Sequence, residues 1–586
     1  MFDLASEGAS QGVQLVERQS PSYQKELGEP AFSPDGSQLY YTHNTSPGGS
    51  FVYHEDSHSE LFEIRALSLT DGETESVAGG YGGAVRASPS PSGDFLAYVK
   101  RVRASSRLFV KNLATDTDLM LVEDLDPDMQ ETWGVYGLYP NFAWLPNDAG
   151  LVYWAKGRLW QVAFPSGDIR EIPFHIKDER VIYSAPRPAV AVGADTFDTA
   201  MVRFAQTAPD GEHVVFESLG KLWIQSSRGA PKPLTNHQDA RHEYSPVWAP
   251  DGRELFFFSW SDLEGTQLHR ISRKGRAEKS LPLPQGHYVN LSVSPSGEAL
   301  LFRKLSGDDL THPDWGKSPG LYRLDLADSN AVRLVDEGAA PSEGLDGRVY
   351  YTHRSWGEKG AAATVLKSVS LAGDDERTHA KSELARSMHL SPDGRYLAFV
   401  ENYQLHLTRV PALGVAFDVG PKMQALPVVQ LSENGADYVS FSSDSRRIHW
   451  SLGAEHFSYA LANFPENTAV SSVSLSQTMT ADKPAQRLAL IGARAVTMDA
   501  ARQVIENAVI LIRDNRIEAI GSAAELSVPE GAVEVDLSGM TVVPGFIDAH
   551  AHGPYGRDEI IPQSNWSLLA HLALGVTTVQ IGRAHV

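Results

Sequence analysis

The sequence contains no cysteine, and that absence removes several kinds of chemistry at once. Disulfide bonds, a cysteine nucleophile and any zinc or iron–sulfur site with thiolate ligands are all excluded. Basic residues are in short supply, because 51 Lys and Arg stand against 73 Asp and Glu, which gives a net charge of −22. This balance argues against nucleic acid as a partner, since phosphate binding requires a basic surface.

Long apolar runs are missing as well. No stretch approaches the roughly 20 residues that a membrane-spanning helix needs, so we expect no membrane span. The first residues, Met1–Glu7, contain neither a basic segment nor an apolar segment, so no signal peptide is visible in the printed sequence. These observations leave the cellular compartment open.

Apolar and turn-forming residues are abundant. Of the 586 residues, 42% are apolar, which is enough to bury substantial cores and excludes a disordered chain. The sequence also contains 49 Gly and 34 Pro, and these numbers predict many turns.

One short phrase recurs along the first four-fifths of the chain. It places Pro, a small or acidic residue and Gly between two apolar runs. Pro fixes φ at the second position of a turn, Asp tolerates the next position and Gly supplies a positive φ, so each phrase predicts a hairpin. Clear copies lie at 33–36, 90–93, 208–211, 249–252, 294–297 and 391–394, and looser copies at 144–148, 345–347 and 441–444.

A second pair of predicted strands follows each phrase, and the unit recurs roughly every 40 to 65 residues. This period predicts a mainly β protein with a multi-bladed β-propeller of seven to nine four-stranded blades over residues 1–480. Eight blades are favoured, because propellers usually have four to eight. The phrase at 244–252 resembles the TolB-like and Tricorn-like propeller repeat. That resemblance concerns the fold alone, since such propellers serve many functions.

Beyond Pro484 the pattern changes to short Ile- and Val-rich strands. The stretch Phe546–His550 is apolar enough for a buried parallel strand. A helix is predicted at 565–574, and a second strand follows at 575–579. Strand, helix and strand in this order are typical of the opening of a (β/α)8 barrel.

Two histidines lie at the end of the first of these strands. Residues i and i+2 of a strand point to the same side, so His550 and His552 are expected to present two imidazoles to one divalent ion. Imidazole is a good ligand for zinc and for other transition ions. Asp548 projects from the same side, where its carboxylate could orient a ligand. Two hydrogen-bonded histidines at a strand end would give the same His-x-His pattern without a metal.

In this order the small sheet, the Pro-Gly turn and the sequence from Asp548 to His552 resemble the amidohydrolase family. The resemblance implies a small β-sandwich over 481–545 and the first strands of an incomplete (β/α)8 barrel over 546–586. It also implies a metal-dependent hydrolase, with zinc as first choice, that cleaves C–N bonds in a small amide, a cyclic amide or a peptide-like substrate. His550 and His552 match the first two metal ligands of the family.

The remaining ligands of the family have no counterpart in this chain. They are a carboxylated Lys or a Glu, two further His and a catalytic Asp. Only 34 residues follow His552, whereas a barrel needs about 250. The last six residues, 581–586, equal the translation in one frame of a common sequencing-library adapter. We therefore expect the gene to continue, and the printed chain to be an inactive fragment with no catalytic residue of its own.

Two other functions stay open at this point. The propeller could be a binding or scaffold module, or the protein could be a propeller-bearing peptidase. Residues 316–320 match the G-x-S-x-G pattern of serine hydrolases, but a nucleophile elbow needs a strand before it and a helix after it, and the flanks here predict a loop. The resemblance favours a periplasmic or extracellular location, and the formation of a homo-oligomer is left open.

Overall fold

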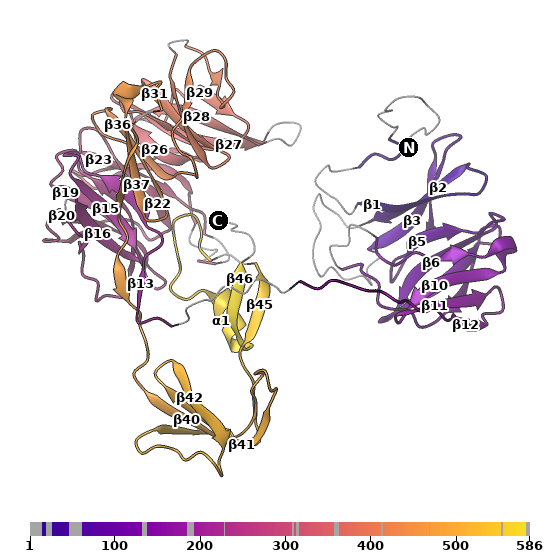
Figure 1. Ribbon diagram of the computed structural model, residues 1–586. Helices are drawn as coiled ribbons and strands as arrows, with labels where there is room; N and C mark the ends of the chain where they lie inside the picture. Colours follow the sequence, from indigo (N-terminus) through magenta and orange to yellow (C-terminus); the bar gives the residue numbers. More distant parts are fainter. Residues whose placement is uncertain are drawn as a thin grey trace. The chain divides into compact units, whose positions relative to one another are not determined.

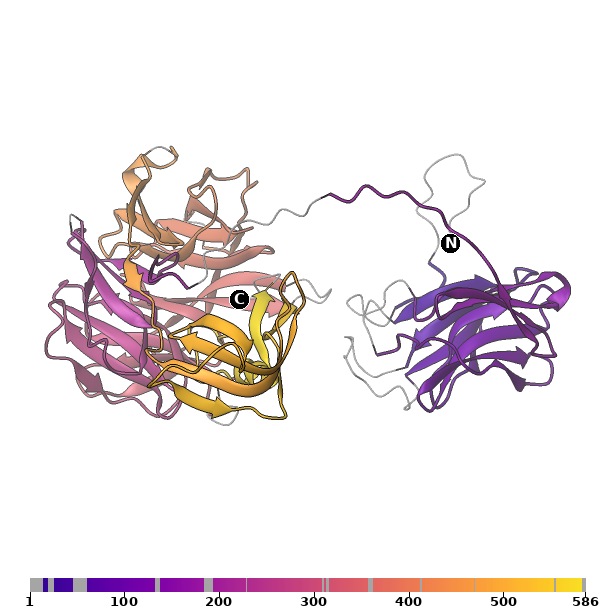
Figure 2. The same cartoon turned by 60° about the horizontal axis from the view of Figure 1, so that its bottom comes forward.

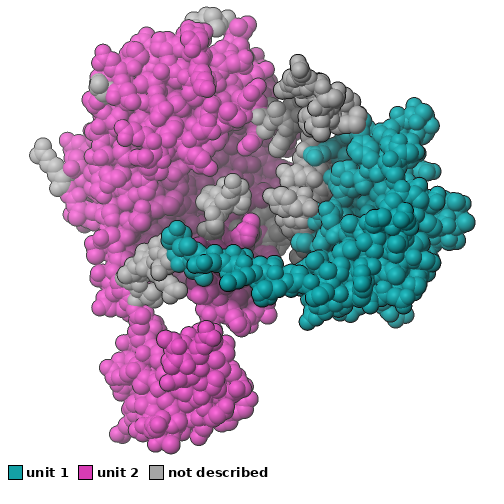
Figure 3. All heavy atoms as spheres, turned by 45° about the vertical axis from the view of Figure 1, so that its right-hand side comes forward, with its two compact units in different colours: residues 1–187 teal, residues 188–586 magenta. Residues whose placement is uncertain are grey.

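The structure is a computed structural model, and its chain divides into two compact units, Met1–Arg187 and Pro188–Val586 (Figure 3). Among the residues that the structure describes, no helix is both long enough and apolar enough to cross a membrane. The described residues are 14–18, 26–45, 61–131, 137–183, 193–227, 229–307, 310–311, 316–356, 362–411, 414–467, 469–552 and 555–581.

The first unit contains three antiparallel sheets of four strands each. A short 3-10 helix, Pro146–Asp148, lies between the first two strands of the third sheet. The strands are β1 (Leu27–Phe32), β2 (Gln38–Asn44), β3 (Phe62–Ser68) and β4 (Thr74–Ala78); β5 (Val85–Pro89), β6 (Phe95–Val102), β7 (Ser105–Asn112) and β8 (Thr117–Val122); and β9 (Ala143–Trp144), β10 (Gly150–Ala155), β11 (Arg158–Ala163) and β12 (Ile169–Ile172).

The second unit contains six further sheets of the same design (Figure 1). Its first three sheets comprise β14 (Arg203–Thr207), β15 (His213–Ser218), β16 (Lys221–Ser226) and β17 (Lys232–Pro233); β18 (His242–Trp248), β19 (Glu254–Ser261), β20 (Gly265–Ser272) and β21 (Lys279–Leu281); and β22 (Tyr288–Val293), β23 (Ala299–Lys304), β24 (Gly320–Asp325) and β25 (Ala331–Val335).

The fourth of these sheets gains a fifth strand, β33, which pairs with β29 in parallel. The last sheet is followed by a 3-10 helix after β37, Leu461–Asn463. The strands of the last three sheets are β26 (Ala339–Glu343), β27 (Arg348–Trp356), β28 (Ala362–Ser370), β29 (Arg377–Ser382) and β33 (Phe417–Asp418); β30 (Ala385–Leu390), β31 (Tyr396–Glu401), β32 (Gln404–Arg409) and β34 (Val428–Gln430); and β35 (Asp437–Phe441), β36 (Arg447–Leu452), β37 (Glu455–Ala460) and β38 (Ser471–Ser474).

The six sheets of the second unit close on themselves. Each contacts the next, and β14 of the first sheet contacts β35 and β36 of the last. The two ends of the six-sheet segment also pair with each other, because β13 (Thr196–Asp198) forms a two-stranded sheet with β39 (Thr478–Thr480). Lys483 also forms an ion pair with Asp195 beside them. The second unit therefore contains a closed, six-bladed ring.

The described residues thus hold nine blade-like sheets, three in the first unit and six in the second. Nine equals the number of phrase copies in the sequence and exceeds the favoured number of eight. The predicted mainly β fold of repeated four-stranded antiparallel sheets is confirmed. The predicted propeller segment, 1–480, covers sheets of both units.

The recurring phrase forms the predicted turn between the first two strands of a blade. At 391–394, Ser391 Oγ donates to Asp393 Oδ1 (2.7 Å), and the same oxygen accepts from Arg395 N (3.1 Å). Gly394 takes a φ of +70°, in the region that favours glycine. Strands β30 and β31 pair on either side of this turn.

A β-bulge interrupts the innermost strand of most blades. At the bulge, one residue takes a positive φ and the register with the neighbouring strand shifts. A bulged residue leaves the ladder, so its N–H is available to another partner. The residues concerned are Glu29 and Arg86 in the first unit, and Phe204, Ser245, Asn290, Ala340 and Tyr438 in the second.

The predicted β-sandwich over 481–545 is a single mixed sheet among the described residues. A β-bulge at Gly492 interrupts its central strand β40, and small apolar clusters form around Ala489 and around Ala495. The sheet is formed by β40 (Arg487–Val496), β41 (Val504–Arg513), β42 (Arg516–Ser522), β43 (Val533–Asp536) and β44 (Thr541–Val542). Figure 2 brings this part of the chain forward.

The described chain ends in a strand–helix–strand element. β45 (Phe546–Ala551) and β46 (Val576–Ile581) pair in parallel, and α1 (Trp566–Ala573) connects them. Asn565 caps α1, since its side chain accepts from Leu568 N (3.1 Å). Gly575, with a φ of +86°, follows the helix. This element has the order predicted from the sequence, and the described residues contain no further barrel strand.

Candidate metal centre

The candidate centre lies at the C-terminal end of β45. Parallel pairing with β46 places this end beside the end of β46. Ala551 is buried, whereas His550 and His552 are exposed. Most of the strand is exposed, and the two histidines lie two residues apart, which places their side chains on the same side of it.

The two imidazoles meet. His550 Nε2 and His552 Nε2 lie 3.0 Å apart, and the ring centroids are 4.8 Å apart. Two nitrogens on one tetrahedral zinc ion, each about 2.05 Å from the metal, would lie about 3.3 Å apart. The observed spacing fits two ligands of one ion after a small outward movement. It equally fits a hydrogen bond between the rings, in which one nitrogen donates and the other accepts.

Asp548 contacts the backbone of His550. Its Oδ1 accepts from His550 N (3.0 Å), which shapes the backbone of the strand. Its Oδ2 lies 3.7 Å from Nε2 of His571 on α1. His571 Nδ1 donates to Ser567 O (2.7 Å), so its Nε2 is the nitrogen that faces the carboxylate. Asp548 of β45 and His571 of α1 therefore face each other, and they form an ion pair when His571 is protonated.

Sequence reasoning missed the part that His571 plays here. The histidine lies in the predicted helix, but nothing in the local pattern gives the rotation of that helix toward β45. The signal that the sequence does contain is the position of His571 on the last turn of α1. Within the described ranges, no group of three or more His, Cys, Asp or Glu side chains is arranged to hold a metal ion. The structure thus gathers two candidate ligands.

The serine of the G-x-S-x-G pattern lies in a loop, as expected. Ser318 precedes β24 and takes a φ of +54°, and its carbonyl accepts from Tyr322 Oη (2.7 Å). A strand, not a helix, follows it. This segment lacks the strand–turn–helix geometry of a nucleophile elbow.

Two curated proteins share limited sequence similarity with the chain. An uncharacterized peptidase, YuxL of Bacillus subtilis, is 27% identical over 210 residues, which is 34% of this chain and 29% of that protein. An imidazolonepropionase of Rhizobium rhizogenes is 33% identical over 69 residues, which is 12% of this chain and 17% of that protein. The chain thus spans less than a third of either relative. No protein-family model matches it.

Solved structures with similar sheets include the tricorn protease, at a TM-score of 0.34 and 9% identity, with 77% of this chain and 49% of that chain covered. TolB of Acinetobacter baumannii has a TM-score of 0.30 and 14% identity, with 57% and 79% covered. These TM-scores are too low to support an argument, so the blades are assigned from the strand pairing of this chain alone.

Proposed function

We propose that this chain belongs to a metal-dependent hydrolase of the amidohydrolase type, which cleaves C–N bonds in amides or cyclic amides. The single observation that carries the proposal is the 3.0 Å approach of His550 Nε2 to His552 Nε2 at the end of a parallel strand. The similarity to an imidazolonepropionase supports it, since that enzyme is named for a substrate that contains a cyclic amide.

In this proposal the chain contributes two of the ligands of a divalent ion, with zinc as first choice. The ion, when bound, would polarise a substrate carbonyl and activate water. His550 and His552 would hold it through Nε2, and both are exposed, so solvent and substrate can reach the site. Asp548 would hold the backbone of β45 in place beneath the ligands and would lie against α1.

The test uses the protein expressed from the full open reading frame of its gene. We expect it to hydrolyse a cyclic amide panel that includes imidazolonepropionate, and to lose at least 100-fold in kcat/KM when His550 or His552 is changed to Asn. His175→Asn, at an exposed histidine of the first unit, is the matched control and should keep full activity. Full turnover after both His550→Asn and His552→Asn would exclude the proposal.

A second candidate function is a propeller-bearing peptidase. The similarity to peptidase YuxL over 210 residues favours it. Cleavage of peptides that a serine-reactive inhibitor abolishes, and that a metal chelator leaves unchanged, would select this function over the amidohydrolase.

A further inference from the structure

The loop between β45 and α1 reaches the axis of the six-bladed ring and places one carboxylate there. Glu559 is half-buried, and three donor groups from the ring surround its carboxylate. Its Oε2 accepts from Asn290 N (2.9 Å) and from Ser245 Oγ, and its Oε1 accepts from Asn290 Nδ2 (2.7 Å). The carboxylate therefore has a partner on both oxygens.

Inner strands of neighbouring blades build this site. Ser245 of β18 and Asn290 of β22 are both bulge residues with positive φ. Ala340 N, at the bulge of β26, donates to Asn290 Oδ1 (3.0 Å) and so turns the Asn290 amide with its NH₂ toward Glu559. Arg203 of β14 donates to the Glu559 carbonyl oxygen (2.7 Å). Four consecutive blades thus supply or orient the groups that contact Glu559.

The first unit contains the same arrangement with a different carboxylate. Glu29, the bulge residue of β1, is buried and accepts from Arg86 N (2.6 Å) at the bulge of β5. It also accepts from Leu138 N (2.6 Å) and Thr42 Oγ1 (2.8 Å). In both units, therefore, the bulge N–H of an inner strand binds a carboxylate, which indicates a property of the fold.

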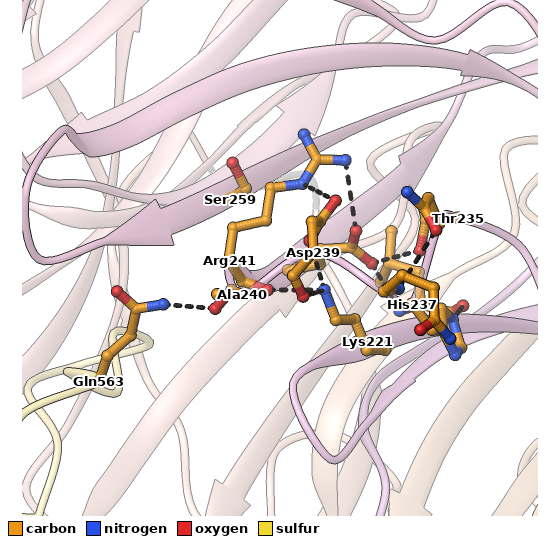
Figure 4. A network of polar contacts seen from close by, with 12 residues as sticks. Lys221, Thr235, His237, Asp239, Ala240, Arg241, Ser259 and Gln563 are labelled. Atoms are coloured by element: carbon orange, nitrogen blue, oxygen red, sulfur yellow. Dashed lines mark hydrogen bonds and ion pairs between the residues drawn. The ribbon is translucent and has the colours of Figure 1, made fainter.

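The rest of the loop is anchored to the same ring. Ile560 is buried in the apolar cluster that contains Tyr244 and Tyr288. Ile561 O lies 3.1 Å from His242 Nδ1. Gln563 donates to Ala240 O, as Figure 4 shows. The segment from Glu559 to Gln563 is thus held on the ring by apolar and polar contacts.

A polar network fixes the ring side of the Gln563 contact (Figure 4). Lys221 Nζ donates to Asp239 O (2.9 Å) and Arg241 O (2.9 Å), the carbonyls on either side of Ala240. Arg241 in turn forms an ion pair with Glu278 (2.7 Å). The segment directly before β18, which contacts the loop through Ala240, is therefore held in place by these contacts.

A cavity of about 820 Å³ leads to the Glu559 site. The inner strands of all six blades line it, and among the described residues of the C-terminal segment Glu559 alone lies on its wall. Burial raises the pKa of Glu559, whereas the hydrogen bonds from Ser245 and Asn290 and the charge of Arg203 lower it. Desolvation is thus the main cost of docking this side chain, and the donors offset part of it.

We propose that these bulge donors form a carboxylate-binding site at the axis of the ring, that Glu559 occupies it in cis, and that a carboxylate ligand entering through the cavity displaces Glu559 and frees the loop. The ligand is a small organic carboxylate or the C-terminal carboxylate of a short peptide. Since the loop follows the strand of His550 and His552, occupancy of the ring would be coupled to that strand. The site itself does not depend on the hydrolase proposal.

The test fills the site after the internal carboxylate is removed. We expect Glu559→Ala to bind acetate by calorimetry and to gain thermal stability with it, while the wild-type chain binds at least tenfold more weakly. Adding Asn290→Ala to Glu559→Ala should abolish acetate binding. Equal acetate binding by wild type and Glu559→Ala, or none by either, would overturn the proposal, as would equal stabilisation by chloride.

Peptides distinguish the two sources of carboxylate. A tetrapeptide with a free C-terminus that binds Glu559→Ala more tightly than acetate, and loses that binding when amidated, identifies a peptide terminus; acetate binding without such a gain identifies a small carboxylate. If Glu559→Ala does not fold, Glu559→Gln serves, because its NH₂ replaces one of the two oxygens that accept from Ser245 and Asn290. Hydrogen exchange at 559–564 should then rise while exchange in the blades is unchanged, and unchanged exchange at 559–564 would contradict the proposal.

Discussion

Two buried histidines make the stability of the second unit sensitive to acid. His449 and His456 stack with ring centroids 5.6 Å apart, and the hydroxyl of Thr207 lies 3.2 Å from His449 Nδ1 and 2.9 Å from His456 Nε2. Burial, and then the neighbouring His456, lower the pKa of His449 to about 3, and burial lowers the pKa of His456 to about 4. Arg447 lowers the pKa of His449 further, and Asp444 raises it.

These shifts predict a loss of stability between pH 6.5 and pH 4. In that window the unfolded state takes up protons with the ordinary pKa of 6.5, whereas the folded state stays neutral until its lower pKa is reached. The free energy of unfolding should fall by on the order of 3 kcal/mol for one such histidine, since a pKa unit is worth about 1.4 kcal/mol. Denaturant unfolding at pH 7, 5.5 and 4 measures it.

The control replaces His449 with Gln. This variant should unfold with a visibly weaker pH dependence than the wild type. An unfolding free energy of the second unit that is flat from pH 7 to pH 4 would show that these histidines are protonated in the fold.

Single residues also mark the limit of what the sequence predicts at the site. The approach of His550 and His552 follows from strand alternation, which is a local rule. The partner of Asp548 could not be predicted, because it depends on how α1 rotates against β45. Glu559 was missed for a related reason. It is an unremarkable acid in a polar loop until the fold brings that loop to inner strands more than 250 residues earlier in the chain.

At the scale of elements, the Pro-Asp-Gly turn and the inner-strand bulge are the repeated devices of a blade. The turn was predictable because its residue types are required by local backbone angles. The bulge was not, because residues as different as Glu29, Phe204 and Asn290 occupy it. Only the bulge places N–H donors at the ring axis. The element on which the proposed carboxylate site depends is therefore the one that residue types do not reveal.

Gly394→Ala tests the turn. A Cβ at this position would meet nothing within 4 Å, so the cost arises from the φ of +70° alone. We expect the free energy of unfolding to fall by about 1 to 2 kcal/mol. Gly420→Ala, whose Cβ would be almost as unobstructed and whose φ lies outside the left-handed region, should change it by less than about 0.5 kcal/mol. Equal effects of the two substitutions in denaturant unfolding would contradict the conformational explanation.

At the scale of the whole molecule, the sequence predicted repeated sheets but not their grouping. The nine copies of the phrase equal the nine blade-like sheets, because each copy forms one hairpin and each of these sheets contains one such hairpin. Closure after six sheets depends on contacts between β14 and the β35–β36 hairpin, which no local pattern encodes. The strand order of the sheet over 481–545 is likewise not given by the sequence, since strand patterns do not reveal that β43 and β44 both pair with β40.

Closure of the ring predicts that the two units unfold separately. Calorimetry of the chain should give two transitions, and fragments 1–187 and 188–586 should each reproduce one of them. Glu559→Ala should lower the midpoint of the second transition and leave the first unchanged. One cooperative transition, absent from both fragments, would instead mean that all nine sheets form one folding unit.

The central claim is that His550 and His552 bind one divalent ion through Nε2. The most direct measurement is nitrogen NMR of the histidine rings in the purified chain during titration with Zn²⁺. Two imidazoles alone should bind weakly, so we expect the Nε2 signals of these two residues to shift together only at high Zn²⁺ concentration. His550→Asn should eliminate the shift of His552. Independent shifts of the two rings, or no shift of either, would contradict the claim.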